Sequence, residues 1–232
     1  AEAMEEAFCG RTADHAYSRI TNPTVQYFEK RIQTITGALS VTALNSGMAA
    51  ISNIFFTLAQ AGANIVTSAH LFGNTYSFFK STLAAFGVEV RFCDLTNPEA
   101  VRAQVDENTC AVFLEVITNP QLEVADLKVL SGIAHQIGAP LIADTTVVPF
   151  HIFHANEFGV DIEIVSSTKY ISGGATSLGG LILDYGTFDW RNSKKLRSMA
   201  DQFGASTFTA KLRKEIHRNL GAYMTPQVAY MQ

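Results

Sequence analysis

A regular alternation of short apolar, β-rich runs with helical stretches is the feature that most constrains how this chain can fold. Helical patterns such as "GMAAISNIFFTLAQ" and "LKVLSGIAHQIG" separate the runs, and the second ends at Gly138, a residue type that often stops a helix. Strands that alternate with helices in this way build βαβ units around a sheet that is buried on both faces. The sequence therefore predicts an α/β fold of three layers, α/β/α, with a mostly parallel sheet. The seven expected strands are "LSVTAL" (39–44), "NIVTS" (64–68), "VEVRFC" (88–93), "CAVFLE" (110–115), "PLIAD" (140–144), "IEIVS" (162–166) and "GLILD" (180–184).

Composition and charge narrow the class of protein. The chain has 232 residues, of which 47% are apolar and 16% charged, so it can bury a sizeable core and is neither disordered nor fibrous. Its net charge of −4 argues against a nucleic-acid surface. The one basic run, "KLRKEIHR" at 211–218, is interrupted by Glu215 and fits a solvated helix face.

The cysteine pattern and the lack of an apolar run long enough to span a membrane predict where the protein is found. Cys9, Cys93 and Cys110 are odd in number and have no CxxC spacing, which is typical of unpaired thiols in a reducing compartment. No apolar run reaches the roughly 18 residues of a membrane span. The first residues, "AEAMEEAF", are acidic rather than signal-like. We therefore expect a soluble, cytoplasmic protein that binds neither membrane nor nucleic acid.

The two ends of the chain differ from its middle. Residues 1–24 lack a strand pattern and finish in "YSRITNPT", where Asn22-Pro23 marks a turn. After Trp190 the chain becomes polar and helical, and no further strand is expected before Gln232. The predicted sheet is therefore complete by about residue 184.

Polar residues gather where the predicted strands end, and ligands of open parallel sheets lie outside those carboxyl ends. The segment "NSGMAA" (45–50) follows the first strand and opens a helix, so its backbone N–H groups and helix dipole predict an anion site, most naturally for phosphate. Strand ends are commonly polar, so a chance grouping is the alternative to a real site. The groups that follow three later strands are Glu115 with the "TNP" of 118–120, Asp144 with Thr145 and Thr146, and Ser166, Ser167, Thr168 and Lys169.

Several common motifs are missing from the sequence. It contains no GxGxxG, GxxxxGK[ST], HExxH or GxSxG, which argues against the common dinucleotide, nucleotide, zinc-protease and serine-hydrolase sites. His151 and His154 are three residues apart, but no third ligand is evident, so we expect no metal site. The Phe pairs at 55–56 and 78–79 are more typical of a core than of a ligand site.

The lysine, the aspartate and the anion site at the strand ends together match what one cofactor requires. Pyridoxal phosphate needs a lysine for its Schiff base, an aspartate that keeps its ring nitrogen protonated, and a phosphate site. Lys169, Asp144 and the helix start at Gly47 supply those three groups. We therefore expect pyridoxal 5'-phosphate (PLP) as the cofactor.

Six segments follow one another in an order that is far more specific than any one of them: "YSRITNPT", "NSGMAA", "LFGNTYSFF", "EVITNP", "IADTTVVPF" and "SSTKYISGG". Together they resemble the Cys/Met-metabolism family of fold-type I PLP-dependent enzymes, over about residues 7–230. That family includes cystathionine γ-synthase, cystathionine lyases, methionine γ-lyase and the O-acylhomoserine sulfhydrylases. The segment "GGLILDYGTFDW" is most similar to the O-acetylhomoserine sulfhydrylase branch. The resemblance implies the large domain of a fold-type I PLP-dependent transferase.

The resemblance also implies roles for individual residues around the cofactor. Lys169 would carry the Schiff base and shuttle protons. Asp144 would pair with the pyridine nitrogen, and Thr146 would lie beside the ring. The phosphate would be bound by the backbone N–H groups of Gly47 and Met48 and by the hydroxyls of Ser166 and Thr168.

Three further residues would bind the cofactor or substrate by the same resemblance. Asn119 in the "TNP" turn would lie near the phenolic oxygen of the cofactor and the substrate carboxylate. Tyr17 and Arg19 of "YSR" would reach the phosphate of a neighbouring subunit. The active site would then be a property of a dimer, and we expect a homo-oligomer, a tetramer built from such dimers.

The first departure from the family pattern lies in the segment "LFGNT" (71–75). The family usually has tyrosine in "LYGGT", whereas this chain has Phe72 in "LFGNT". Phenylalanine can stack on the cofactor but has no hydroxyl to assist proton transfer. The substitution therefore disfavours lyase activity that depends on that acid.

The second departure is length, because family members are much longer. We expect residues 1–24 to be an N-terminal arm that contacts a neighbouring subunit, 25–222 to be the PLP-binding large domain, and 223–232 to begin a missing C-terminal domain. That domain would carry the arginine for the substrate carboxylate. The predicted activity is γ-replacement on an O-acylhomoserine with sulfide or a thiol. The alternatives are a γ- or β-lyase and a catalytically silent PLP-binding or assembly subunit.

Overall fold

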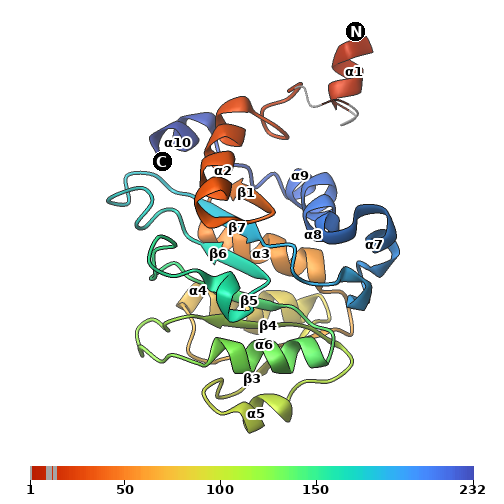
Figure 1. The fold of residues 1–232 in the computed structure, drawn as a ribbon, viewed down its shortest axis with the longest axis vertical. Helices are drawn as coiled ribbons and strands as arrows, with labels where there is room; N and C mark the ends of the chain where they lie inside the picture. The colour runs from red at the N-terminus through yellow and green to blue at the C-terminus, as the bar shows by residue number, and fades with distance from the viewer. Residues whose placement is uncertain (1, 9–11, 13–14) are drawn as a thin grey trace.

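Seven strands form one sheet at the centre of the described chain (Figure 1). The structure is a computed structural model that describes residues 2–8, 12 and 15–232. Every expected strand is present, and each end lies within one residue of its predicted position. The strands are β1 (Ser40–Leu44), β2 (Asn64–Thr67), β3 (Glu89–Phe92), β4 (Thr109–Glu115), β5 (Leu141–Asp144), β6 (Ile162–Val165) and β7 (Gly180–Asp184).

The sheet is mostly parallel, as predicted, and one strand of the described sheet is reversed. The strand order is β1-β7-β6-β5-β4-β2-β3. The pairs β2–β3, β2–β4, β4–β5 and β5–β6 are parallel. Strand β7 is antiparallel to both of its neighbours, β1 and β6. The connection from β6 to β7 therefore returns at the same edge of the sheet and needs no crossover helix.

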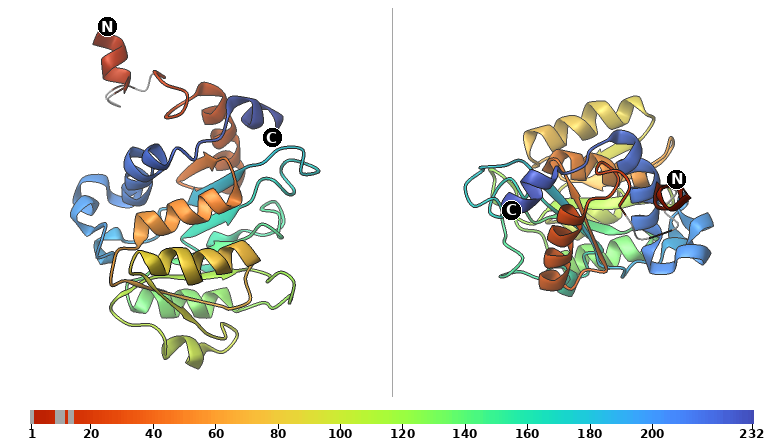
Figure 2. Two further views of the ribbon diagram at one scale, coloured as in Figure 1. Left: turned by 180° about the vertical axis from the view of Figure 1, so that it is seen from behind. Right: turned by 90° about the horizontal axis from the view of Figure 1, so that it is seen from above.

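Helices cover both faces of the sheet (Figure 2), which confirms the predicted three layers. The main helices are α1 (Glu2–Phe8), α2 (Pro23–Thr36), α3 (Gly47–Leu58), α4 (Gly73–Ser77), α5 (Pro98–Arg102), α6 (Leu127–Gln136), α7 (Arg197–Phe203), α8 (Thr207–Lys211), α9 (Arg218–Leu220) and α10 (Pro226–Met231). Shorter or π-helical segments are η1 (Phe78–Leu83), η2 (Ala155–Phe158), η3 (Trp190–Asn192), η4 (Gly204–Ser206) and η5 (Leu212–His217).

In the central strands, alternating residues enter different core clusters. In β4, Phe113 packs in the cluster that contains α3, whereas Val112 and Leu114 pack in the cluster that contains α6. Successive strand residues point to opposite faces, so a sheet covered on both sides requires apolar residues at every position. Phe55 and Phe79 contact Phe113 edge to face, with ring centroids 5.6 and 5.3 Å away, which confirms that these phenylalanines are core.

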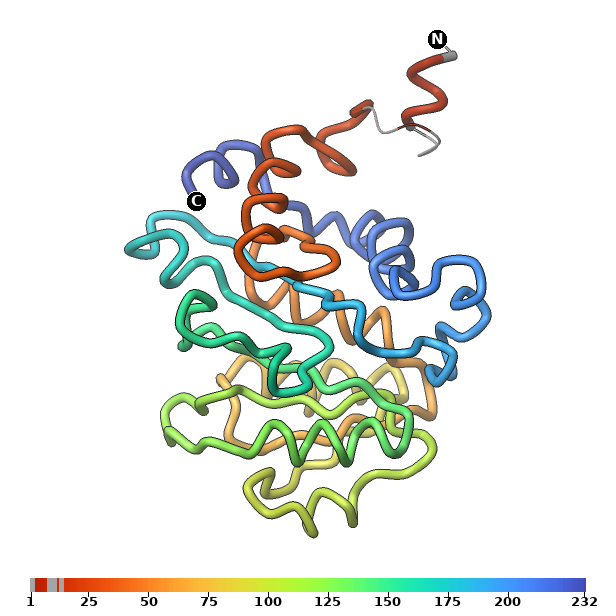
Figure 3. The backbone as a smooth tube through the Cα atoms, in the orientation of Figure 1, coloured from red at the N-terminus to blue at the C-terminus, as the bar shows by residue number. Residues whose placement is uncertain are grey.

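Helices α1 and α10 lie toward the same end of the long axis (Figure 1 and Figure 3). Helix α2 begins at the predicted turn, because Asn22 Oδ1 accepts a hydrogen bond from the Thr24 N–H at 3.0 Å and Pro23 opens the helix. Ala229 of α10 packs in one cluster with Phe28 and Ile32 of α2. None of the helices in the described ranges is long and apolar enough to cross a membrane.

The basic run at 211–218 is only partly a solvated helix face, which corrects the sequence prediction. Arg213 forms an ion pair with Glu29 of α2 at 2.8 Å and donates a hydrogen bond to the Val41 carbonyl of β1. His217 is 7% exposed. Burial, followed by the nearby positive charges of Arg213 and Arg19, lowers the pKa of His217 to about 4. This side of the helix packs against β1 and α2.

Candidate active site

One cavity of about 790 Å³ lies at the edge of the sheet where β4, β5 and β6 end and α3 begins. Parallel strands end at the same edge, which brings together side chains from distant parts of the sequence. Nine of the predicted site residues line this cavity: Gly47, Met48, Phe72, Asn119, Asp144, Thr146, Ser166, Thr168 and Lys169.

The start of α3 forms one wall of the cavity. Ser46 caps the helix, since its Oγ accepts a hydrogen bond from the Ala49 N–H at 3.1 Å. The first N–H groups of an α-helix have no partner within the helix and attract anions. A Cβ added to Gly47 would lie 2.8 Å from the Ser166 Cβ, so only glycine allows α3 to approach the end of β6 this closely. This arrangement fits a phosphate group.

Asp144 supplies a carboxylate at the end of β5. It is partly buried, and its Oδ1 accepts a hydrogen bond from the Thr146 N–H at 2.9 Å. Burial raises the pKa of Asp144, and the hydrogen bonds from Thr146 oppose that shift. None of the ion pairs among the described residues includes Asp144. A desolvated carboxylate without a cationic partner favours a positively charged group beside it, so the site fits a protonated pyridine nitrogen.

The segment that follows β6 is tied to its neighbours by hydroxyl groups. Thr146 Oγ1 accepts a hydrogen bond from the Ser166 N–H at 2.8 Å. Thr168 Oγ1 donates to the Gly179 carbonyl at 3.2 Å and accepts from the Gly179 N–H at 3.0 Å. A phosphate contact by the Thr168 hydroxyl proton would therefore replace its bond to Gly179. Lys169 is exposed and lines the cavity, with its backbone N–H donated to the Ser166 carbonyl at 3.1 Å.

Glu115 is a cavity residue to which the sequence assigned no role. It ends β4 and is in register with Asp144 of β5. Its Oε1 accepts a hydrogen bond from the Phe72 N–H at 2.5 Å, and its Oε2 accepts one from the Asn119 N–H at 3.2 Å. Burial, together with the negative charge of Asp144, raises the pKa of Glu115 to about 7. Its position at a strand end was visible in the sequence, but the two segments that it joins were not.

Other cavity residues were assigned no role from the sequence: Ile51, Asn74, Thr75, Ile117, Val147, Tyr170 and Leu178. Five of them lie within the segments that carry the family resemblance, namely Asn74, Thr75, Ile117, Val147 and Tyr170. Within the described part of the chain, no three His, Cys, Asp or Glu residues are placed to hold a metal ion.

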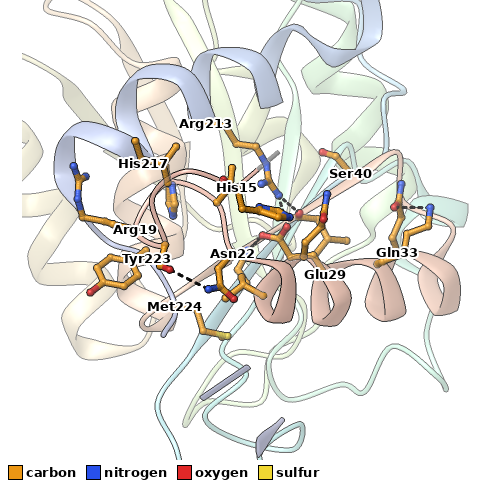
Figure 4. Close-up of a pocket in the computed structure, with 18 of the residues that line it drawn as sticks. His15, Arg19, Asn22, Glu29, Gln33, Ser40, Arg213, His217, Tyr223 and Met224 are labelled. Atoms are coloured by element: carbon orange, nitrogen blue, oxygen red, sulfur yellow. Dashed lines mark hydrogen bonds and ion pairs between the residues drawn. The ribbon is translucent and has the colours of Figure 1, made fainter. Parts of the chain in front are cut away.

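Tyr17 and Arg19 lie outside this cavity in the single chain. Arg19 lines a separate pocket of about 390 Å³ whose walls also include Arg213 and His217 (Figure 4). Its guanidinium lies 5.1 Å from the centre of the Tyr17 ring and donates a hydrogen bond to the Arg218 carbonyl. The predicted contact of these two residues with a neighbouring subunit therefore stays a prediction.

Comparison with known proteins places this chain in a family. A model of the family described as "Cys/Met metabolism PLP-dependent enzyme" matches residues 1–232. Sulfhydrylase FUB7 of Fusarium oxysporum is 37% identical and covers 90% of this chain and 52% of its own length. Homocysteine synthase of Schizosaccharomyces pombe is 36% identical, with 91% and 53% covered. O-acetyl-L-homoserine sulfhydrylase of Corynebacterium glutamicum is 34% identical, with 97% and 55% covered. The chain thus spans about half the length of these curated relatives.

Two solved structures share the fold. O-acetylhomoserine sulfhydrylase of Wolinella succinogenes is 47% identical with a TM-score of 0.85, covering 92% of this chain and 62% of its own. A Campylobacter jejuni protein assigned as an O-acetylhomoserine (thiol)-lyase is 27% identical with a TM-score of 0.93, covering 99% and 60%, and carries a pyridoxyl-lysine monophosphate. Because the family model matches the whole chain, this chain belongs to the family of PLP-dependent enzymes of Cys/Met metabolism.

Proposed function

We propose that the protein containing this chain catalyses PLP-dependent γ-replacement on an O-acylhomoserine, with sulfide or a thiol as the second substrate. The observation that carries this proposal is the cavity that combines Lys169, the carboxylate of Asp144 and the start of α3. Relatives named as sulfhydrylases and homocysteine synthases support it. O-acetylhomoserine is the proposed acyl substrate because two relatives and two solved neighbours carry that name.

Each residue of the cavity would have a defined part in this chemistry. Bound PLP would supply an electron-withdrawing ring that stabilises negative charge on the substrate carbons. Lys169 would hold the cofactor and would accept and return the proton of the substrate α-carbon. Asp144 would hold positive charge on the ring nitrogen, with Thr146 at its side. The anion wall would consist of the N–H groups of Gly47 and Met48 with the hydroxyls of Ser166 and Thr168.

Two cavity residues would orient the reactants. Phe72 lines the cavity with 47% of its surface exposed, so its ring is available to stack on a planar ligand. Asn119 lines the same cavity and would orient the substrate carboxylate with its side-chain amide.

The proposed assembly completes this site. Tyr17 and Arg19 belong to residues 1–24, the proposed arm, and would bind the phosphate in a neighbouring subunit of a homodimer or a tetramer of dimers. Residues 25–222 would form the PLP-binding domain, and 223–232 would lead into a C-terminal domain that carries the arginine for the substrate carboxylate. The unpaired thiols of Cys93 and Cys110 support a cytoplasmic location, because free thiols are typical of a reducing compartment; Cys9 lies outside the described residues.

A γ- or β-lyase is the second candidate, and the family membership supports it. Phe72 argues against it because phenylalanine has no hydroxyl to act as an acid. A substrate panel on the full-length protein separates the two activities. Turnover of O-acetylhomoserine with sulfide supports γ-replacement, whereas turnover of methionine or cystathionine alone supports a lyase. Cofactor binding without any turnover supports a silent subunit.

The Lys169→Ala substitution tests the proposed role of the lysine. The full-length variant should lose the yellow absorbance of the lysine-bound cofactor, and its turnover should fall at least about a thousandfold. Lys128→Ala, an exposed lysine on α6, is the matched control and should retain both properties. Full turnover by Lys169→Ala would contradict the proposed role of Lys169.

A further inference from the structure

A buried carboxylate joins two segments that face the cavity. Glu115 is 7% exposed at the end of β4. It accepts hydrogen bonds from the backbone N–H of Phe72, which precedes α4, and from the backbone N–H of Asn119, which precedes α6. One side chain of the rigid sheet thus contacts both segments that present Phe72 and Asn119.

We propose that Glu115 is a positioning residue that holds the main chains of Phe72 and Asn119 in the places from which they contact cofactor and substrate. This inference rests on the function proposed for the cavity. Glu115 acts through these two residues, whose own roles were predicted, and has none of its own in the reaction.

Carboxylate chemistry explains why this position suits glutamate. An ionised carboxylate only accepts hydrogen bonds and has two oxygens, so it can satisfy two N–H groups at once. Phe72 has extended backbone angles (φ −49°, ψ 133°) and caps α4, so its N–H has no helical partner. Glutamine in place of Glu115 keeps one accepting oxygen and turns an NH₂ group toward the second N–H donor. One of the two anchors is then lost.

A second link joins the same two segments outside the cavity. His70 Nδ1 lies 2.7 Å from Glu123 Oε2, and the two side chains are 46% and 39% exposed. Solvent screens exposed pairs, so this link contributes little. Neither residue lines the cavity. Glu123 therefore offers a matched control, because its carboxylate also joins the same two segments, through the side chain of His70, without facing the ligand.

The neighbouring carboxylate couples the two hydrogen bonds of Glu115 to the bound ligand. Glu115 and Asp144 lie on adjacent strands in register, and the charge of Asp144 opposes ionisation of Glu115. A positive group bound beside Asp144 offsets that repulsion and favours the ionised Glu115 that accepts both hydrogen bonds. The two hydrogen bonds that Glu115 accepts should therefore be strongest when the cofactor is bound.

The test compares Glu115→Gln with Glu123→Gln in the full-length protein. Amide hydrogen exchange of the cofactor-free protein should show the Phe72 and Asn119 amides exchanging at least about tenfold faster in Glu115→Gln. With PLP added, the visible circular dichroism of this variant should change, and its kcat should fall about tenfold or more with a smaller change in KM. Glu123→Gln should stay within about twofold of the unmodified protein in each measurement.

Two results would overturn the proposal: unchanged exchange and dichroism in Glu115→Gln, or equal changes in Glu123→Gln. Glu115→Asp keeps the carboxylate and should recover part of the dichroism and kcat. If Glu115→Gln does not fold, Glu115→Asp is compared with Glu115→Ala instead. Equal dichroism and kcat in those two variants would overturn the proposal. The exchange and dichroism readouts do not depend on turnover. A protein that binds PLP but converts no substrate would therefore contradict the proposed function and leave the test of Glu115 intact.

Discussion

At the scale of single residues, Phe72 is the cavity residue at which the sequence predicts a departure from the family pattern. Its ring lines the cavity, and its backbone N–H is held by Glu115, so the position of the ring does not depend on a hydroxyl group. A hydroxyl added at this place would face the cavity and could act as an acid toward a leaving group.

The Phe72→Tyr substitution should therefore shift the reaction toward elimination. We expect the ratio of elimination to γ-replacement with O-acetylhomoserine to rise at least about tenfold in the full-length protein, since a positioned general acid contributes that much or more. The ratio is measured as 2-oxo acid and homocysteine formed in the same assay. Phe86→Tyr, which adds the same hydroxyl to an exposed ring outside the cavity, should leave the ratio unchanged. An unaltered ratio in Phe72→Tyr would show that Phe72 does not restrain the lyase reaction.

Residue types in the sequence identified residues that line the cavity, but not the contacts that hold those residues in place. Lys169, Asp144 and Gly47 could be selected because lysine, aspartate and a helix start have recognisable chemistry at the ends of strands. Glu115 has the same location, but its contacts with Phe72 and Asn119 depend on how two loops fold back over β4. Such contacts between distant segments leave no local pattern.

At the scale of elements, the reversed strand β7 places the start of α3 beside the lysine segment. Leu44, the last residue of β1, pairs with Gly180, the first residue of β7. A Cβ on Gly180 would lie 2.1 Å from the Ser46 carbonyl oxygen, which is backbone and cannot move aside easily. Glycine at this position therefore lets β7 and the start of α3 lie in contact.

The Gly180→Ala substitution should reduce both the stability of the protein and its affinity for the PLP phosphate. We expect the free energy of unfolding to fall by about 1–3 kcal/mol, as for other overpacked sites, and the dissociation constant for PLP to rise about tenfold. Gly132→Ala in α6 is the control, because nothing lies within 4 Å of its Cβ position and alanine favours a helix. Denaturant unfolding and cofactor titration measure the two effects. Equal stability of the two variants would contradict this account of Gly180.

At the scale of the whole molecule, the proposed site depends on which subunit supplies Arg19. In the single chain Arg19 lines the pocket whose walls also include Arg213 and His217 (Figure 4). It is not among the residues that line the Lys169 cavity. If Arg19 binds the phosphate of a neighbouring subunit, each active site needs residues from two chains.

Complementation between variants tests this arrangement. Full-length Arg19→Ala and Lys169→Ala subunits should each be inactive, and their co-expression should restore about a quarter of the normal activity, because half the dimers are mixed and each has one intact site. Lys169→Ala co-expressed with Asp144→Asn is the control. Both of those residues line the same cavity, so mixed dimers have no intact site and activity should stay absent. Failure of the first pair to complement would contradict a shared site.

The sequence by itself determined the seven strands and the three layers, and it predicted nine residues that line the cavity. Strand positions follow from local apolar periodicity, and candidate site residues follow from residue type and motif at strand ends, so both can be recognised along the chain. The tertiary structure alone decided that β7 runs antiparallel between β1 and β6, that Glu115 joins Phe72 to Asn119, and that Arg213 and His217 pack inward. These features depend on pairing between distant segments, whose free energy comes from the close packing of the whole molecule and not from any local pattern.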